Sequence, residues 1–164
     1  MDALPPNVRA ELNKRHKAAA VTIAALVVAT LLLSIIAYVG RSYFRQQGDS
    51  TIDLAVRLVV FVFGAGSIVW RRTKFSSMRL QDIGSLQGAL GVLKTLERTT
   101  LQVALLSVAV AVSGFITTAM SGNHLYTYWS AVIAIILLVY HYPRRASWNN
   151  AVLKYAADLN TTPA

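Results

Sequence analysis

The chain has 164 residues, of which 55% are hydrophobic and 14% are charged, and its formal net charge is +9. A typical soluble domain has about 25% charged residues, so this composition favours a membrane protein over a soluble one. The chain contains no cysteine, which excludes disulfides, thiol chemistry and cysteine-ligated metal sites.

The positive charge lies beside the apolar segments. Thirteen of the 16 Lys and Arg residues fall within residues 9–17, 71–98 and 144–154. Lys and Arg accumulate on the cytoplasmic flanks of membrane spans. The charge therefore predicts orientation, with both termini cytoplasmic, and gives no indication of a nucleic-acid partner.

The first predicted elements are a cytoplasmic amphipathic arm over residues 1–17 and a membrane span over residues 18–39. The uncharged run 18–40 is long enough to cross a bilayer core about 30 Å thick, which needs about 20 residues. It is too long for the apolar region of a secretory signal, which has about 7–15 residues. Ala20 and Ala24 are small residues four apart, so they are predicted helix-packing positions.

The second span is predicted over residues 51–70 and completes a first hairpin, residues 18–70. Arg57 lies inside this span near its outer end, and Asp53 stands four residues earlier, the spacing of a same-face ion pair. An ionisable residue within a span can mark a solute path. Because Arg57 lies close to the predicted membrane surface, its side chain can also reach the lipid headgroups and anchor the helix there. Both interpretations of the pair stay open.

Small residues near the inner end of the second span predict a second packing surface. Gly64 and Ser67 present little bulk, so a neighbouring helix can approach closely there.

Residues 71–98 are predicted to be a cytoplasmic loop that contains an amphipathic helix on the inner leaflet. From residue 78 onward, apolar residues recur at steps of three and four, namely Ile83, Leu86, Leu90 and Leu93. Gly84 and Gly88 form a G-x-x-x-G step in the same segment. Glycine costs about 1 kcal/mol in a helix. We therefore expect a compensating close contact at Gly84 and Gly88.

A second hairpin is predicted over residues 99–143, followed by a cytoplasmic tail over 144–164. The 45 residues from 99 to 143 contain no Lys, Arg, Asp or Glu, and a polar turn at 121–124 divides them. His124 and His141 stand at the predicted boundaries without further ligands at metal-binding spacing, so they are interpreted as polar boundary residues. The hydroxyl and small residues of the third span favour helix packing over a water-filled path; they are Ser107, Ser113, Gly114, Thr117 and Thr118.

The basic flanks at the inner surface can attract anionic lipid headgroups, at about 1 kcal/mol per charge. The predicted headgroup contacts are Arg71, Arg72, Lys74, Arg144 and Arg145. Orientation requires the same charges, so this signal has little specificity.

The sequence thus predicts an all-α membrane protein, a four-transmembrane-helix bundle with an amphipathic inner-leaflet helix between spans two and three. It has no catalytic or nucleotide-binding motif, so we expect neither enzymatic activity nor a cofactor. We expect a non-catalytic subunit, a scaffold or accessory component of a membrane complex or homo-oligomer in the bacterial inner (plasma) membrane. Its expected partners are membrane lipids and other membrane subunits or further copies of itself. The alternative is a small oligomeric channel or carrier with Arg57 and Asp53 at its outer mouth.

Overall fold

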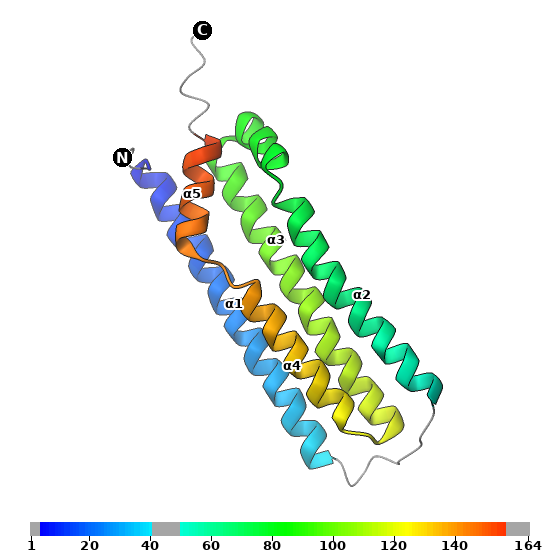
Figure 1. Cartoon of the computed structure of the whole chain (residues 1–164). Helices are drawn as coiled ribbons and strands as arrows, with labels where there is room; N and C mark the ends of the chain where they lie inside the picture. Colours follow the sequence, from blue (N-terminus) through cyan, green and yellow to red (C-terminus); the bar gives the residue numbers. More distant parts are fainter. Residues whose placement is uncertain (1–3, 41–49, 157–164) are drawn as a thin grey trace.

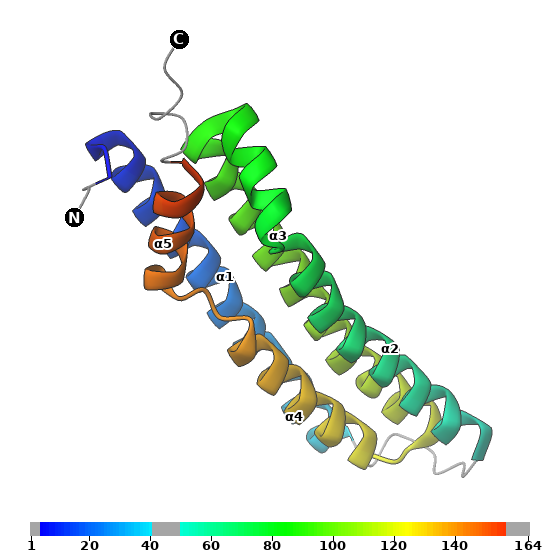
Figure 2. The ribbon, with the colours of Figure 1, turned by 45° about the horizontal axis from the view of Figure 1, so that its top comes forward.

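The computed structural model describes residues 4–40 and 50–156. This part of the chain folds into five helices and contains no strand. The helices are α1 (Pro6–Val39), α2 (Ser50–Lys74), α3 (Ser77–Ser121), α4 (Leu125–Tyr140) and α5 (Arg145–Ala156). Figure 1 shows α1 to α4 side by side as an elongated bundle, with α5 beyond the end of α4, and Figure 2 shows the same arrangement from a second direction.

Three of these helices are long and apolar enough to cross a membrane: α1, α2 from Leu54 to Lys74, and α3 from Met78 to Ser121. A fourth span is possible where α4 and α5 are joined across a 45° bend. The 16 residues of α4 alone correspond to about 24 Å of helix, less than a bilayer core of about 30 Å. The structure therefore confirms an all-helical chain with three or four candidate spans.

The helix α3 is the centre of the bundle, because it contacts all four other helices. The helix α2 packs against α3 and to a smaller extent against α4, and it makes no contact with α1 within the described residues. In Figures 1 and 2, α2 accordingly lies at the edge of the bundle.

The first helix includes both the predicted arm and the predicted first span. It starts at Pro6, which suits the first helical turn because that turn needs no backbone N–H donor. It continues without a break to Val39. The predicted boundary between the arm (residues 1–17) and the span (residues 18–39) therefore falls within one unbroken helix.

The segment 78–98 differs from the prediction of one amphipathic helix. It belongs to the 45-residue helix α3, which runs on through Thr99 as predicted but is broken at Gly88. Gly88 has φ 64° and ψ −166°, a backbone conformation open essentially to glycine alone. The break divides the predicted apolar face, leaving Leu86 83% exposed and Leu93 fully buried. Gly88 therefore lies at a break in the helix, and its predicted role as a helix-packing residue stays a prediction.

One end of the bundle has an apolar core of its own. We call this the basic end; it comprises residues 4–20, 71–98 and 141–156, where α1 and α3 begin and α5 lies (Figure 1). The buried residues of this apolar core come from α1, α3 and α5, and they are Val8, Leu12, Ala19, Leu80, Val92, Leu93, Leu96, Trp148 and Val152.

The helix α5 is the element that the sequence interpretation missed, because residues 144–164 were expected to form a polar tail. Residues 145–156 of that tail are helical, and Trp148 and Val152 are buried against α1 and α3. Their four-residue spacing places both side chains on one face of a short helix whose other residues are mostly polar.

The opposite end of the bundle closes through the tight turn between α3 and α4, as predicted. Gly122 has φ 71°, the left-handed conformation that commonly ends a helix. The Thr118 hydroxyl donates to the Asn123 carbonyl (3.0 Å), and the Thr127 hydroxyl donates to Thr118 Oγ1 (2.8 Å). These bonds fix α3 against α4 where the chain reverses.

Candidate functional site

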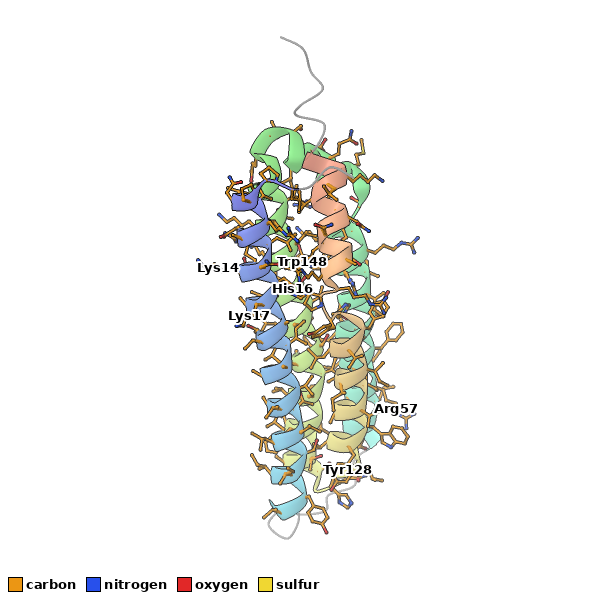
Figure 3. The ribbon with its side chains drawn as sticks, turned by 90° about the vertical axis from the view of Figure 1, so that its left-hand side faces the viewer. Lys14, His16, Lys17, Arg57, Tyr128 and Trp148 are labelled. Carbon is orange, nitrogen blue, oxygen red and sulfur yellow. The ribbon has the colours of Figure 1, made fainter. Side chains whose placement is uncertain are left out.

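The predicted ion pair near the outer end of α2 is described only in part. Arg57 is exposed on α2, and Figure 3 shows it toward the same end of the bundle as Tyr128. The side chain of Asp53 lies outside the described part of the structure. The pairing of Asp53 with Arg57 therefore stays a prediction.

The predicted packing residues have different surroundings. Gly64, Ser67 and Gly84 are buried, whereas Ala20 is half-buried and Ala24 is exposed. A Cβ atom at Gly64 would lie 3.8 Å from Leu137 Cδ1, an ordinary contact with α4. The glycine that the packing most requires is Gly114, where a Cβ would lie only 2.4 Å from Ser130 Cβ and 2.8 Å from the Tyr126 carbonyl oxygen. The sequence placed Gly114 in a polar-small stripe but did not single it out.

Ser67, Arg71 and His141 form a polar network at the C-terminal end of α2, in which Ser67 and His141 are buried and Arg71 is half-buried. Arg71 Nη1 donates to the Tyr140 carbonyl oxygen (2.5 Å) and contacts His141 Nδ1 at 3.2 Å. His141 Nε2 lies 3.3 Å from Ser67 Oγ, whose hydroxyl donates to the Gly64 carbonyl (2.8 Å). His141 is 2% exposed and Ser67 is fully buried.

The geometry of this network determines the protonation of His141. A guanidinium can only donate, so Nδ1 of His141 must accept the bond from Arg71. The remaining ring proton is then on Nε2, which donates to Ser67 Oγ. His141 is thus a neutral imidazole that connects α2 to the end of α4, a more specific role than the boundary position that the sequence indicated.

A second histidine fixes the link between α4 and α5 from the side of α1. His16 Nε2 donates to the Pro143 carbonyl oxygen (2.9 Å), because a carbonyl can only accept. The ring of His16 also meets that of Trp148 edge-on, with centroids 5.7 Å apart. Figure 3 shows His16 on α1 facing Trp148, with Lys14 and Lys17 nearby on the same helix. The residues 141–144 are therefore held from both α1 and α2.

A cavity of about 460 Å³ opens beside this link. It lies between the C-terminal end of α2, the middle of α3 and the α4–α5 link. Positively charged, aromatic, apolar and hydroxyl side chains line it. Its lining residues are Arg71, Phe75, Leu96, Thr100, Val139, Tyr140, His141, Tyr142, Pro143, Arg144, Ser147, Trp148 and Ala151. We call it the link cavity.

The link cavity separates the five predicted headgroup contacts into two groups. Arg71 and Arg144 line it, whereas Arg72, Lys74 and Arg145 do not. The Arg71 guanidinium lies 5.0 Å from the ring centroid of Tyr140 and 5.8 Å from that of Phe75, so aromatic faces stabilise it on the cavity wall. Sequence blocks alone could not make this separation, because adjacent residues on a helix point in different directions.

Two ion pairs made by Arg15 lie elsewhere in the basic end. Arg15 contacts Glu11 Oε1 at 2.7 Å within α1 and Glu97 Oε2 at 2.6 Å on α3. These bonds join the first helix to the third beside the apolar core. Neither carboxylate lines the link cavity.

Among the described residues, no group of three or more His, Asp or Glu side chains could hold a metal ion. Comparisons with protein-family models, with curated proteins and with solved structures find no match to this chain. The proposals below therefore depend on the geometry of the chain itself.

Proposed function

We propose that this chain is a non-catalytic integral membrane subunit, which acts as a scaffold or accessory component of a membrane complex or homo-oligomer. The observation that carries the proposal is how the polar groups of the bundle are used. Every buried side-chain N or O atom of the described residues has a hydrogen-bond partner. In α3 and α4 these partners are other groups of the bundle, as with Thr118 and Thr127, so the polar side chains serve packing.

The surface that remains available to other helices is apolar. On α2, at the edge of the bundle, Phe61 is 71% exposed and Val62 is 61% exposed. A Cβ at Gly66 would have no heavy atom within 4 Å, so this glycine leaves space for a neighbour. On α1, Ala24 is also exposed. Small exposed residues of this kind allow close approach between helices in lipid.

The oligomeric state tests this proposal. We expect native mass measurement after mild detergent extraction to find a homo-oligomer or a co-purified membrane protein. Gly66→Leu on α2 and Ala24→Leu on α1 add bulk to the two exposed surfaces, and the variant that dissociates the assembly identifies the surface used. A strictly monomeric wild-type chain without a partner would contradict the proposal.

We further propose that α1, α2 and α3 each cross a bacterial inner membrane, and that α4 with the link at residues 141–143 forms a fourth span. The basic end is then cytoplasmic, with residues 77–87 at the inner leaflet. The positive flanks of the basic end support this orientation. Because the chain lacks cysteine, single cysteines can test it. We expect Leu86→Cys to be shielded by lipid from a water-soluble thiol reagent and Gln81→Cys to be labelled from the cytoplasmic side. Equal labelling of both positions would place residues 77–87 in water.

The alternative function is an oligomeric channel or carrier, and one observation favours it. Arg57 is exposed on the peripheral helix α2, where a shared path between copies would pass. Ion flux into vesicles that contain the purified chain separates the two functions. If Arg57→Gln changes ion selectivity while Arg72→Gln, at the other end of α2, does not, the channel replaces the scaffold.

A further inference from the structure

The link cavity combines positive charge with apolar walls at the end of the bundle where the membrane surface is expected. We propose that it binds the phosphate group of an anionic membrane lipid, with the lipid's acyl chains along the outer surfaces of α3 and α4. This site is independent of the proposed packing function, since it uses other residues.

The first argument is uncompensated charge. Arg71 and Arg144 line the cavity, and no Asp or Glu is among its lining residues. Neither arginine takes part in the ion pairs of Arg15 with Glu11 and Glu97. Two guanidinium groups that line one cavity repel each other, and an oxyanion bound by both removes that repulsion. Arg is also the side chain best suited to phosphate, because its planar N–H groups can donate two parallel bonds.

The second argument is that Arg71 is held in place before any ligand binds. Its bonds to the Tyr140 carbonyl and to His141 use one nitrogen of the guanidinium, Nη1. His141 is itself fixed by Ser67. The other N–H groups of Arg71 are the donors that remain for a ligand. A positioned donor loses little conformational entropy on binding, which favours affinity.

The third argument concerns the kind of molecule that carries the phosphate. A volume of about 460 Å³ is within the range of roughly 300–1,000 Å³ that small-ligand cavities have. Val139 and Tyr140 are among the lining residues, and they are 65% and 59% exposed on α4. Acyl chains can lie against the apolar parts of these side chains, whereas a free phosphate ion gains no stabilisation from contact with them. Basic cavities between helices at the inner surface are suited to anionic headgroups.

Native mass measurement of the full-length chain in detergent, titrated with phosphatidic acid, tests the proposal. We expect one phosphatidic acid molecule to bind in preference to diacylglycerol, which has the same chains without the phosphate. Arg144→Gln should weaken binding at least about fivefold, the effect of one basic residue beside an anionic lipid. The matched control is Arg145→Gln, which removes the same charge one residue away, outside the cavity lining, and should change binding less than twofold. Arg71 is left unchanged, because its substitution would also break the bonds to Tyr140 and His141.

A variant without any change of charge separates a shaped site from surface electrostatics. Ser147 lines the cavity on the exposed side of α5, so Ser147→Phe should fill the space and also weaken binding at least fivefold while the helix content stays unchanged. Equal losses in Arg144→Gln and Arg145→Gln would overturn the proposal, as would full binding by Ser147→Phe. Displacement of the lipid by millimolar inorganic phosphate would overturn the assignment to a lipid, because it would show that the acyl chains contribute nothing.

Discussion

The basic end and the rest of the bundle bury different mixtures of side chains. In the basic end, large apolar residues are inside, with Leu12 at 2% and Leu96 at 1% exposure. In the rest of the bundle, many large apolar residues point outward, and Leu105 and Ile136 are 61% and 62% exposed. Some apolar side chains such as Ile23 and Leu138 are buried there. Many of the other buried residues are small or carry hydroxyl groups, and they include Ser107, Ala111, Thr118, Thr127, Ser130, Ala131 and Ala134.

This difference in the share of small and hydroxyl residues fits the solvent that each region is suited to. Water drives apolar side chains into a core, so the basic end is organised like a small soluble helical domain. Lipid gives no such drive, and helices in lipid associate through close packing of small residues and through interhelical hydrogen bonds. The helix α1 and the part of α3 after Gly88 run through both regions. The histidines at the boundary, His16 and His141, hold the α4–α5 link from α1 and from α2.

The largest effect is expected at the close contact between α3 and α4 at Gly114. Gly114→Leu should destabilise the protein by at least about 4 kcal/mol, because even its Cβ would lie 2.8 Å from the backbone oxygen of Tyr126. Unfolding of the helices by a denaturing detergent measures the change. With the chain separated from its assembly, Gly66→Leu is the matched control, since its Cβ meets no atom of the same chain within 4 Å. Equal stability of the two variants would show that α3 and α4 do not approach closely.

The next largest effect is expected in the core of the basic end. Leu93→Ala should cost about 2–5 kcal/mol, because it leaves a cavity at a fully buried position. Leu86→Ala, at a position 83% exposed, should change the free energy of unfolding by less than about 0.5 kcal/mol. The same unfolding measurement applies. Similar losses of stability in both variants would contradict the break and support the single apolar face that the sequence predicted.

The break in α3 should show a moderate effect. Gly88→Ala should destabilise by about 1–3 kcal/mol, because an alanine at φ 64° and ψ −166° is strained. Thermal unfolding followed by circular dichroism can detect this. Gly66→Ala, the same change in an open position of α2, should cause no loss of stability. An unaffected Gly88→Ala variant would indicate that residues 77–121 form one continuous helix.

The smallest effect is expected at the ion pairs of Arg15. Glu97→Gln should cost about 1 kcal/mol, because the pair is partly exposed and joins α1 to α3. Glu11→Gln breaks only a pair within one helix and should cost about half as much. Both effects should shrink in high salt, which screens exposed charges. If the loss of stability in Glu97→Gln does not depend on salt concentration, it comes from lost packing and not from the lost charge.

Hydropathy and charge by themselves determined the all-helical class, the positions of the long apolar helices and the turn at 121–124. These features follow from local physics: an uncharged run of sufficient length favours a span, and a glycine between polar residues favours a turn. The sequence also grouped Arg71 with Arg144 as basic residues at one surface. It could not predict that these two line a cavity and that Arg72 and Arg145 do not.

Only the tertiary structure decided which side chains meet. The helix α5 has too few apolar residues to be recognised alone, and it is buried because α1 and α3 provide the surfaces for Trp148 and Val152. The contact of Gly114 with Ser130 and the chain from Gly64 through Ser67 and His141 to Arg71 join residues far apart in sequence. Periodicity describes one helix at a time, so it cannot show which faces of two helices come together or where a glycine is needed between them. Which helix faces meet is therefore decided by the packing of the whole bundle.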